Sequence, residues 1–496
     1  MDSLNLTLIA INLEGYSLGV AYIDAMIREH PSLHHTVRSV QLMYDLEQVQ
    51  HPYFDLSTIV VDLQQTNPDV IGMSCFCWNL DICLRLVALF DAAFPNVHLI
   101  LGGPEVTVDS VHLFEHLPDG TFLVFDEGEE PFCDLLGSFL GSASPTIPSG
   151  VAVVKGSSLE ALPVPREPLP VQKIPSPFRM GVLQMDCIDW MTYTTTRGCM
   201  YRCSYCRWGD GKGIRRFSLE RVREDLSLLS QNDFKHIWIT DTCFGSDKAR
   251  DNEILDILVR WPRDTMFSFE TRPADISEEL ATGLAQLPLN WVAIGVQTLN
   301  PTARRMCGRH DSIETTLKGI DLLYRTLPDP SVINLDMIFG LPGDSFESCL
   351  ESLDELKATF PLAKFSCSVL HILPGTPIWA LARKECWVIQ EAHGDHELVD
   401  RPDFPISDVL AAKKIILGID CLQNEFCRWW SGPLVQSSRV PFSQIANVAG
   451  AACYAYGLHR HRAYKRTPFF RQVNERFPNM FNDIRRSVES LLSDHH

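Results

Sequence analysis

The chain has 496 residues, of which 45% are apolar and 21% are charged, and its formal net charge is −19. This balance is typical of a soluble globular protein, and the length corresponds to about three domains of roughly 150 residues each. The acidic surface disfavours nucleic acid as a partner, because nucleic acid binds to basic surfaces. No apolar run reaches the roughly 20 residues that span a bilayer, and the N-terminus lacks the basic segment of a signal peptide. We therefore expect a cytoplasmic protein without a membrane span.

Residues 1–145 alternate apolar strands with amphipathic helices. In chain order, the predicted elements are a strand over 6–12, a helix over 19–30, a strand over 70–76, a helix over 80–94, a strand over 98–104, and a strand, turn and helix within 121–140. Apolar strands that alternate with helices form a parallel sheet covered on both faces. The expected fold class is thus α/β, with an N-terminal Rossmann-like domain over residues 1–145.

Ligands bind such sheets in the crevice at the carboxyl ends of the strands. This sequence places small and polar residues there, in the segments 15–17, 74–76, 102–104 and 127–129. Gly102 and Gly103 would let a flat or bulky ligand lie against the backbone, and Ser74 offers a small donor. No G-x-G-x-x-G motif follows the first strand, which disfavours a dinucleotide.

The rest of the chain divides into three parts. Residues 146–190 are rich in proline and predict an extended connector. Residues 191–385 predict a partial (βα)6 barrel similar to a TIM barrel, with its chemistry at the carboxyl ends of the strands. Residues 386–496 predict a helical C-terminal region. The strands expected in the barrel lie over 192–198, 236–241, 266–271, 291–297, 332–340 and 364–373.

Three cysteines stand apart from the rest of the sixteen. Most of the others lie inside apolar patterns and are expected in the core. Cys199, Cys203 and Cys206 instead share one loop after the first barrel strand, in the sequence CMYRCSYC. Three thiolates can hold a [4Fe–4S] cluster and leave one iron open to a substrate or cofactor. A zinc site would need a fourth ligand, and no second pair lies suitably near in the sequence.

This loop, with Tyr205 before its last cysteine, resembles the cluster motif of the radical S-adenosylmethionine (radical SAM) superfamily. The strand ends that follow are similar to that family in order and spacing, so the resemblance covers about residues 190–385. They are Thr240–Thr242, Glu270–Pro273, Gly295–Thr298, Asp336–Gly343 and Leu373–Pro377. The resemblance implies that the three cysteines ligate a [4Fe–4S] cluster and that SAM chelates its open iron.

The same resemblance implies a SAM site at the strand ends, lined by Tyr205, Asp241, Glu270 and Gln297. Asp241 and Glu270 could accept hydrogen bonds from the SAM amine and the ribose hydroxyls. A helix cap at Asp241 and a structural salt bridge at Glu270 stay open as alternatives. Cys243 follows the second barrel strand and either faces the site or belongs to the core.

The tandem of an N-terminal sheet and this barrel resembles the cobalamin-binding class of radical SAM enzymes. The resemblance rests on Ser74, the Gly102–Pro104 segment, the Glu127–Glu130 segment and the connector residues 174–178, and it covers about 375 residues with the barrel. It implies that Ser74, Gly102, Gly103 and Glu127 contact cobalamin. The sequence has no Asp-x-His-x-x-Gly motif to ligate cobalt from below, so the lower axial position stays undetermined. The loop Phe76–Asn79 either packs near the cobalt or forms a hydrophobic turn.

The resemblance implies a cobalamin-dependent radical SAM C-methyltransferase. Such an enzyme transfers a methyl group from methylcobalamin, supplied by SAM, to an unactivated carbon of a small molecule or peptide, as in a biosynthetic pathway. It also needs a one-electron reductant of the flavodoxin or ferredoxin type. A radical SAM cyclase or rearrangement enzyme of the same architecture is the main alternative. A methylthiotransferase would need further cluster ligands in the N-terminal domain, and Cys75 and Cys77 are too close together for that.

The C-terminal region carries Trp429, Trp430 and a basic run over residues 459–466. Aromatic and cationic side chains together could cap a substrate cleft or bind an anionic group. A helical layer with a solvated basic face is the preferred interpretation. The histidines do not show metal-ligand spacing, so we expect no second metal.

Overall fold

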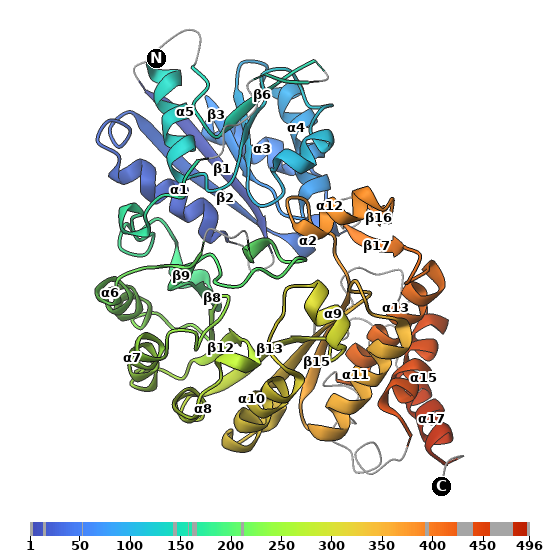
Figure 1. Cartoon of the computed structure of the whole chain (residues 1–496). Coiled ribbons are helices and arrows are strands. Elements are labelled where there is room, and N and C mark those ends of the chain that lie inside the picture. The colour runs from blue at the N-terminus through green and yellow to red at the C-terminus, as the bar shows by residue number, and fades with distance from the viewer. Residues whose placement is uncertain are drawn as a thin grey trace.

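The computed structural model describes residues 3–12, 16–51, 53–141, 146–156, 158–160, 166–209, 213–391, 396–423, 440–456 and 480–493. Two sheets form the frame of the molecule, one in the N-terminal part and one in the middle of the chain, and the C-terminal helices lie beside the second sheet (Figure 1). The predicted α/β fold, with a helical C-terminal region, is confirmed. No helix of the described segments is long and apolar enough to cross a membrane.

The first sheet has seven strands in the order β2-β1-β3-β4-β5-β6-β7. The first five pair in parallel, and the last two extend the edge as an antiparallel hairpin. These strands are β1 (Leu4–Asn12), β2 (Val37–Asp45), β3 (Val70–Ser74), β4 (His98–Gly102), β5 (Phe122–Val124), β6 (Val151–Lys155) and β7 (Ser158–Glu160). The strand order reverses between β1 and β3, which is the switch point where open α/β sheets bind their ligands.

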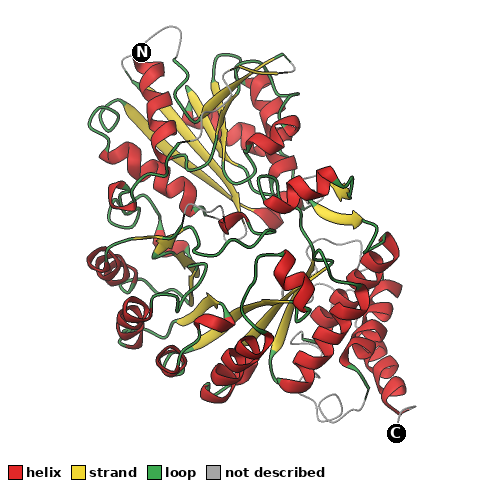
Figure 2. Ribbon diagram, in the orientation of Figure 1, coloured by secondary structure: helices red, strands yellow, loops and turns green. Residues whose placement is uncertain are grey.

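Helices cover both faces of this sheet, as Figure 2 shows. One face carries α1 and α5, and the other carries α3 and α4, with a separate buried apolar cluster under each pair. The helices are α1 (Leu18–Glu29), α2 (Leu46–Gln50), α3 (Ser57–Thr66), α4 (Leu80–Ala93) and α5 (Glu129–Gly141), with a 3₁₀ turn η1 (Val108–Leu113). Coverage of both faces explains why β1, β3 and β4 are almost continuously apolar.

The structure differs from the expected connector over residues 146–190. Its first part forms β6 and β7, because the alternating apolar residues of VAVVK pair with β5. The described part from residue 166 onward has no strand until β8 (Trp190–Tyr193), and contains the short 3₁₀ turns η2 (Val171–Lys173) and η3 (Met185–Cys187). The described part of the connector from residue 166 is therefore irregular, with short turns, and it follows the edge hairpin.

The second sheet has six parallel strands in the order β15-β14-β13-β12-β11-β8. Its two edge strands do not pair with each other, so the sheet is a partial barrel, as predicted. Besides β8, its strands are β11 (His236–Ile239), β12 (Met266–Thr271), β13 (Leu289–Gln297), β14 (Ile333–Phe339) and β15 (Lys364–Val369). The expected first strand, 192–198, is divided, because a hairpin of β9 (Thr196–Arg197) and β10 (Arg215–Arg216) follows β8.

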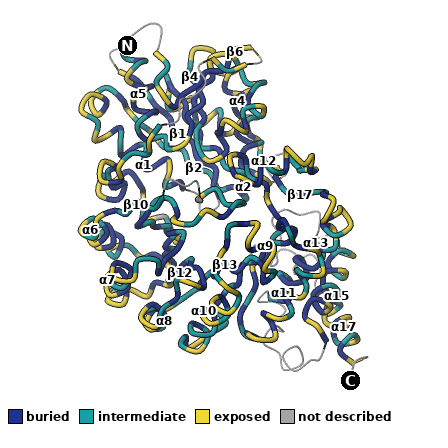
Figure 3. Tube along the Cα trace, viewed as in Figure 1, coloured by how far each residue is buried: buried dark blue, intermediate teal, exposed yellow. Residues whose placement is uncertain are grey.

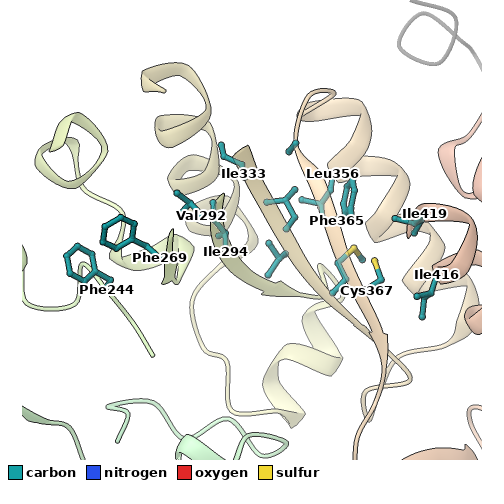
Figure 4. Packing of buried hydrophobic residues seen from close by; sticks show 14 of the residues in the cluster. Phe244, Phe269, Val292, Ile294, Ile333, Leu356, Phe365, Cys367, Ile416 and Ile419 are labelled. Atoms are coloured by element: carbon teal, nitrogen blue, oxygen red, sulfur yellow. The ribbon is translucent and has the colours of Figure 1, made fainter. Parts of the chain in front are cut away.

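Helices cover the outer face of this partial barrel. They are α6 (Leu219–Leu229), α7 (Lys248–Val259), α8 (Glu278–Leu284), α9 (Pro301–Met306), α10 (Ile313–Thr326) and α11 (Phe346–Thr359), with short turns η4 (Arg207–Gly209), η5 (Pro273–Asp275) and η6 (Pro330–Val332). Figure 4 shows part of this packing, with Phe365 of β15 next to Leu356 of α11, and with Val292 and Ile294 together on β13. The buried residues run through the interior of both parts of the chain in Figure 3.

The C-terminal region combines one short hairpin with packed helices. Its elements are α12 (Pro377–Lys384), β16 (Val388–Gln390), β17 (Glu397–Asp400), α13 (Ile406–Leu422), α15 (Phe442–Ala455) and α17 (Met480–Ser493). The long helices pack on one another and on β15. Trp429, Trp430 and the basic run over residues 459–466 lie outside the described residues.

Candidate functional site

The three motif cysteines lie in the loop that follows β9. Cys199 and Cys203 are buried, and Cys206 is half-buried. The Sγ of Cys199 lies 3.9 Å from the Sγ of Cys243 and accepts the backbone N–H of Tyr201 at 3.4 Å. The hydrogen bond from Cys243, together with that of Tyr201, outweighs burial and lowers the pKa of Cys199 to about 6. The loop thus favours the thiolate form, which is the form that binds metal.

Asp241 fixes the chain that leads into this loop. Its carboxylate is fully buried and accepts four hydrogen bonds, from the backbone N–H groups of Thr195 and Thr196 and the hydroxyls of Thr194 and Thr195. Burial raises the pKa of Asp241, although these hydrogen bonds act to lower it. The side chain therefore acts on the protein's own backbone, and a contact of Asp241 with the SAM amine stays a prediction.

Gly198, directly before the first cysteine, closes the hairpin between β9 and β10. Its φ is +79°, a conformation that residues with a side chain rarely adopt. A Cβ at this position would lie 2.3 Å from the carbonyl oxygen of Gly213. The hydroxyl of Thr242 donates to the carbonyl oxygen of Gly198 at 3.0 Å. The turn into the cysteine loop therefore requires glycine.

Two buried arginines lie beside the cysteines, and the sequence analysis did not assign them. Arg309 donates to the Tyr205 hydroxyl at 3.2 Å and lies 3.9 Å from the Sγ of Cys203. Arg272 lies over the Tyr201 ring at 3.6 Å and pairs with Asp311. Nε of each arginine has no hydrogen-bond partner among the described residues. Buried cations with free donor capacity suit an anionic ligand such as a carboxylate or a thiolate-bound cluster.

A cavity of about 410 Å³ lies along strands β12 to β15, from Trp291 and Asn334 near the amino ends to Gln297 near a carboxyl end. Its polar lining includes the predicted Glu270 and Gln297 and, in addition, Asp336 and Asn334. Burial raises the pKa of Glu270 to about 8, and the negative charges of Asp336 and Asp241 add to the effect. Two carboxyl groups in one cavity can bind a cation or accept hydrogen bonds from hydroxyl groups. Asp336 could have been found from sequence, because it stands in the strand-end segment 336–343.

Gln297 enters this cavity from an unusual backbone position. Its φ is +71°, which is rare for a residue other than glycine, and the pairing of β13 with β14 shifts by one residue between Gly295 and Gln297. Such a bulge changes the direction in which the following side chain points. Strained backbone is concentrated at functional sites, where the surrounding structure maintains it. The geometry therefore supports Gln297 as a ligand-binding residue.

A second cavity, of about 240 Å³, lies between the cysteine loop and the end of β15. Tyr205, Cys206 and Arg207 line it from one side, and Leu370 and Leu373 from the other. The two cavities share Ile338 and Ser368 in their linings. A polar cavity and a more apolar one thus adjoin each other next to the cysteines, which suits a ligand with a charged end and an aromatic end.

The carboxyl edge of the first sheet carries the residues expected to contact cobalamin. Ser74 and Gly102 pair at the ends of β3 and β4. Gly103 has φ +106°, and a Cβ there would lie 2.7 Å from the carbonyl oxygen of Cys75 and 2.9 Å from its nitrogen. Two loops of the protein approach each other closely at position 103, and this approach alone requires glycine there, independently of any ligand.

The loop Phe76–Asn79 stands at the switch point. Asn79 is fully buried and holds the loop through hydrogen bonds with the N–H of Phe76 and the carbonyl oxygens of Ile11 and Ser74. The rings of Phe76 and Trp78 stack with centroids 4.4 Å apart, and Trp78 is 39% exposed. A rigid loop here presents an exposed aromatic surface at the place where α/β sheets bind ligands.

Glu127 has a partner that the sequence analysis did not identify. Its carboxylate pairs with Arg215 on β10 through both oxygens. Glu129 pairs with Arg197 on β9. Glu127 therefore contacts the second domain, and a contact with cobalamin stays a prediction.

The donor set fits an iron–sulfur cluster better than a single ion. No three ligating side chains of the described residues lie close enough together to hold one metal ion. A cluster binds each thiolate through a different iron, so its three ligands need not meet at one point. Cys199, Cys203 and Cys206 belong to one loop whose backbone is held by Asp241 and Gly198. These residues fit a cluster ligated by three cysteines.

Comparison with known proteins identifies two family models in the chain. Residues 5–136 match the B12 binding domain, and residues 193–356 match the radical SAM superfamily. The two segments contain the switch-point loop and the cysteine loop, respectively. The B12 binding match precedes the radical SAM match in the chain, which is the order that the sequence analysis expects.

Two methyltransferases are similar in sequence to part of this chain. The cobalamin-dependent radical SAM methyltransferase TokK of Streptomyces tokunonensis is 31% identical over 202 residues, which are 38% of this chain and 30% of that protein. The 2-(S-pantetheinyl)-carbapenam-3-carboxylate methyltransferase of Streptantibioticus cattleyicolor is 32% identical over 193 residues, 36% and 28% of the two chains. The matched segments thus span less than a third of these two relatives.

Among solved structures, the cobalamin-dependent S-adenosylmethionine radical enzyme OxsB, with aqua-cobalamin and S-adenosylmethionine bound, is similar in fold. Its TM-score is 0.67 at 15% identity, and the alignment covers 99% of this chain and 80% of that one. The fold similarity therefore extends across both sheets and the C-terminal region. The chain therefore carries a B12 binding domain followed by a radical SAM domain, and these two domains imply cobalamin, SAM and a [4Fe–4S] cluster as its cofactors.

Proposed function

We propose that the chain is a cobalamin-dependent radical SAM C-methyltransferase that acts on an unactivated carbon of a small molecule or peptide. The observation that carries this proposal is the contact between the ligand-binding edge of the first sheet and the second domain. The Tyr16 hydroxyl, after β1, bonds to Thr192, and Glu105, after β4, bonds to His396 at 2.7 Å. The backbone carbonyl oxygen of His396 accepts the N–H of Ile372, after β15. The two carboxyl edges are thereby held next to each other.

The cluster and SAM are assigned to the cysteine loop and its cavities. Cys199, Cys203 and Cys206 would ligate the cluster, and Arg309 would bind the carboxylate of SAM. Glu270, Asp336 and Gln297 would bind its amine and ribose. The second cavity, beside Tyr205, would take its aromatic base. When bound, these groups supply reductive cleavage of SAM, and methylcobalamin supplies the methyl group.

The chain's own residues supply position and protection from water. Asp241 and Gly198 hold the cysteine loop, and the bulge at Gln297 orients a polar side chain toward the cavity. Ser74, Gly102 and the Phe76–Trp78 surface would form the cobalamin site at the switch point. A substrate between the two edges would contact both cofactors, because the edges are joined by buried contacts on more than one side. Radical chemistry needs such a closed site.

The partner that delivers the electron would be a flavodoxin or ferredoxin. A reducing compartment suits an iron–sulfur cluster and fourteen cysteines of the described segments that form no disulfide, so we place the protein in the cytoplasm.

The test is a cofactor count on protein purified without oxygen and reconstituted with iron, sulfide and hydroxocobalamin. We expect about four irons and about one retained cobalamin per chain. Incubation with SAM, reductant and candidate substrates should then give products heavier by about 14 mass units per methyl group. Cluster without corrinoid would contradict methyl transfer, and rearranged products of unchanged mass would favour the cyclase alternative.

A further inference from the structure

Four charged side chains join the two domains directly beside the cysteine loop. Glu127 and Glu129 follow β5 in the first domain, and Arg197 and Arg215 belong to the β9–β10 hairpin in the second. Nη2 of Arg197 lies 2.6 Å from Oε1 of Glu129, and Nη1 of Arg215 lies 3.1 Å from Oε2 of Glu127. We call these four residues the interdomain clamp.

The pair of Arg197 and Glu129 is largely shielded from water. The side chains are 14% and 8% exposed, and the Arg197 guanidinium also lies over the Tyr22 ring, 4.6 Å from its centroid. A buried ion pair is sensitive to the loss of either partner, because the remaining charge has no compensation. Glu130, the next residue, is more exposed than Glu129. Its side chain is 45% exposed and pairs with Arg166 of the connector.

The clamp acts on the backbone that positions the cysteines. Arg197 stands two residues before Cys199, and the same short segment is held from the barrel side by Asp241. On the other side of the clamp, β5 ends at the same sheet edge as Ser74 and Gly102. The pair of Glu129 and Arg197 therefore gives a short connection between the sheet edge expected to bind cobalamin and the first cysteine.

We propose that Glu129 and Arg197 are positioning residues that fix the distance between the cluster and cobalamin. This inference rests on the proposed function, in which the cluster binds at Cys199, Cys203 and Cys206 and cobalamin binds at the edge of the first sheet. The residues touch neither cofactor in this assignment. They hold the cysteine loop in a fixed position relative to the first domain, so that both cofactors reach one substrate.

Pulsed electron paramagnetic resonance tests the inference without a substrate. Partly reduced holoprotein contains two unpaired spins, one on the reduced cluster and one on cob(II)alamin, and their dipolar coupling reports the distance between them. We expect one narrow distance distribution for the unaltered protein and for Glu130→Gln, and a broadened or shifted distribution for Glu129→Gln. An unchanged distribution in Glu129→Gln that binds both cofactors would overturn the inference, even if its unfolding temperature were lower.

A conservative variant covers the case in which Glu129→Gln does not fold. Glu129→Asp keeps the charge but shortens the side chain, so we expect a folded protein with a shifted distance. The same narrow distribution as in the unaltered protein would contradict the proposal. Failure of the proposed function has a separate signature, because the unaltered protein would then lack the cluster signal or the cob(II)alamin signal.

Discussion

The Sγ atoms of Cys199 and Cys243 lie 3.9 Å apart, although the two cysteines belong to different loops of the barrel. Cys199 starts the three-cysteine motif, and Cys243 follows β11. Both are buried. This contact raises the question of whether Cys243 ligates the cluster or only hydrogen-bonds to a ligand.

We predict that Cys243 is not a cluster ligand. Cys199→Ala, Cys203→Ala and Cys206→Ala should each lose most of the iron, because a site with two cysteines no longer holds the cluster. Cys243→Ala should retain about four irons per chain, because three thiolates remain. Iron and sulfide analysis after anaerobic reconstitution measures this, with the remote buried Cys349→Ala as the control. Loss of iron in Cys243→Ala, but not in the control, would make Cys243 a ligand.

The four hydrogen bonds accepted by Asp241 give a second prediction. Asp241→Asn replaces one acceptor oxygen by an NH2 group that faces other donors, so the mutation should destabilise the barrel by about 2–4 kcal/mol. The cysteine loop should also bind less iron. Denaturant unfolding and iron analysis are the measurements, and Asp256→Asn, an exposed position in α7, is the control. Equal stability of the two variants would show that Asp241 does not hold the loop.

The sequence predicts those parts of the fold that follow from local pattern. All six barrel strands were found, because buried parallel strands are continuously or alternately apolar. Strand β2 was missed because it lies at the sheet edge and its residues VRSVQLMYD are mostly half-exposed. Strands β6 and β7 were missed because prolines follow them closely.

The candidate site, like the fold, could be predicted from the sequence only in part. Spacing alone identified the three cysteines, but the partners of Asp241 and Glu127 lie about 46 and 88 residues away in the sequence, and no local pattern reveals them. The positive φ of Gln297 results from a bulge that depends on the neighbouring strand. Glu127 illustrates the limit most clearly, since the segment was recognised but its arginine partner was not.

The pKa of Glu270 gives a prediction about pH. Burial and two neighbouring carboxyl groups raise this pKa to about 8, so the free protein holds Glu270 mostly neutral below pH 8. SAM carries a permanent positive charge and hydroxyl donors, and it should bind better to the ionised form. Its dissociation constant should therefore fall as pH rises from about 6.5 to 8, by at most roughly tenfold per pH unit.

Binding of radiolabelled SAM to the reconstituted protein at several pH values measures this dependence. In Glu270→Gln the affinity should be weaker and should lose the part of the pH dependence that Glu270 causes. The same steep dependence in Glu270→Gln would assign the titration to another group.

Gln297 combines backbone strain with a place in the cavity. Gln297→Gly removes the strain of a positive φ and should stabilise the protein slightly, by at most about 1 kcal/mol. The same change removes the amide, so SAM should bind several-fold more weakly. Thermal unfolding and SAM binding together separate the two effects, and Gln297→Ala should lose affinity without the gain in stability. Unchanged SAM affinity in both variants would remove Gln297 from the site.

The close approach of Gly103 to Cys75 leads to a prediction for cobalamin. A Cβ at Gly103 would lie 2.7 Å from the carbonyl oxygen of Cys75, whereas a Cβ at Gly120 would have no atom within 4 Å. Both glycines have positive φ, so alanine brings a similar conformational cost at each site and differs only in the collision. Gly103→Ala should therefore displace the loop beside Ser74 and lower cobalamin retention through desalting, while Gly120→Ala should retain it. Equal retention by the two variants would mean that this part of the edge does not shape the cobalamin site.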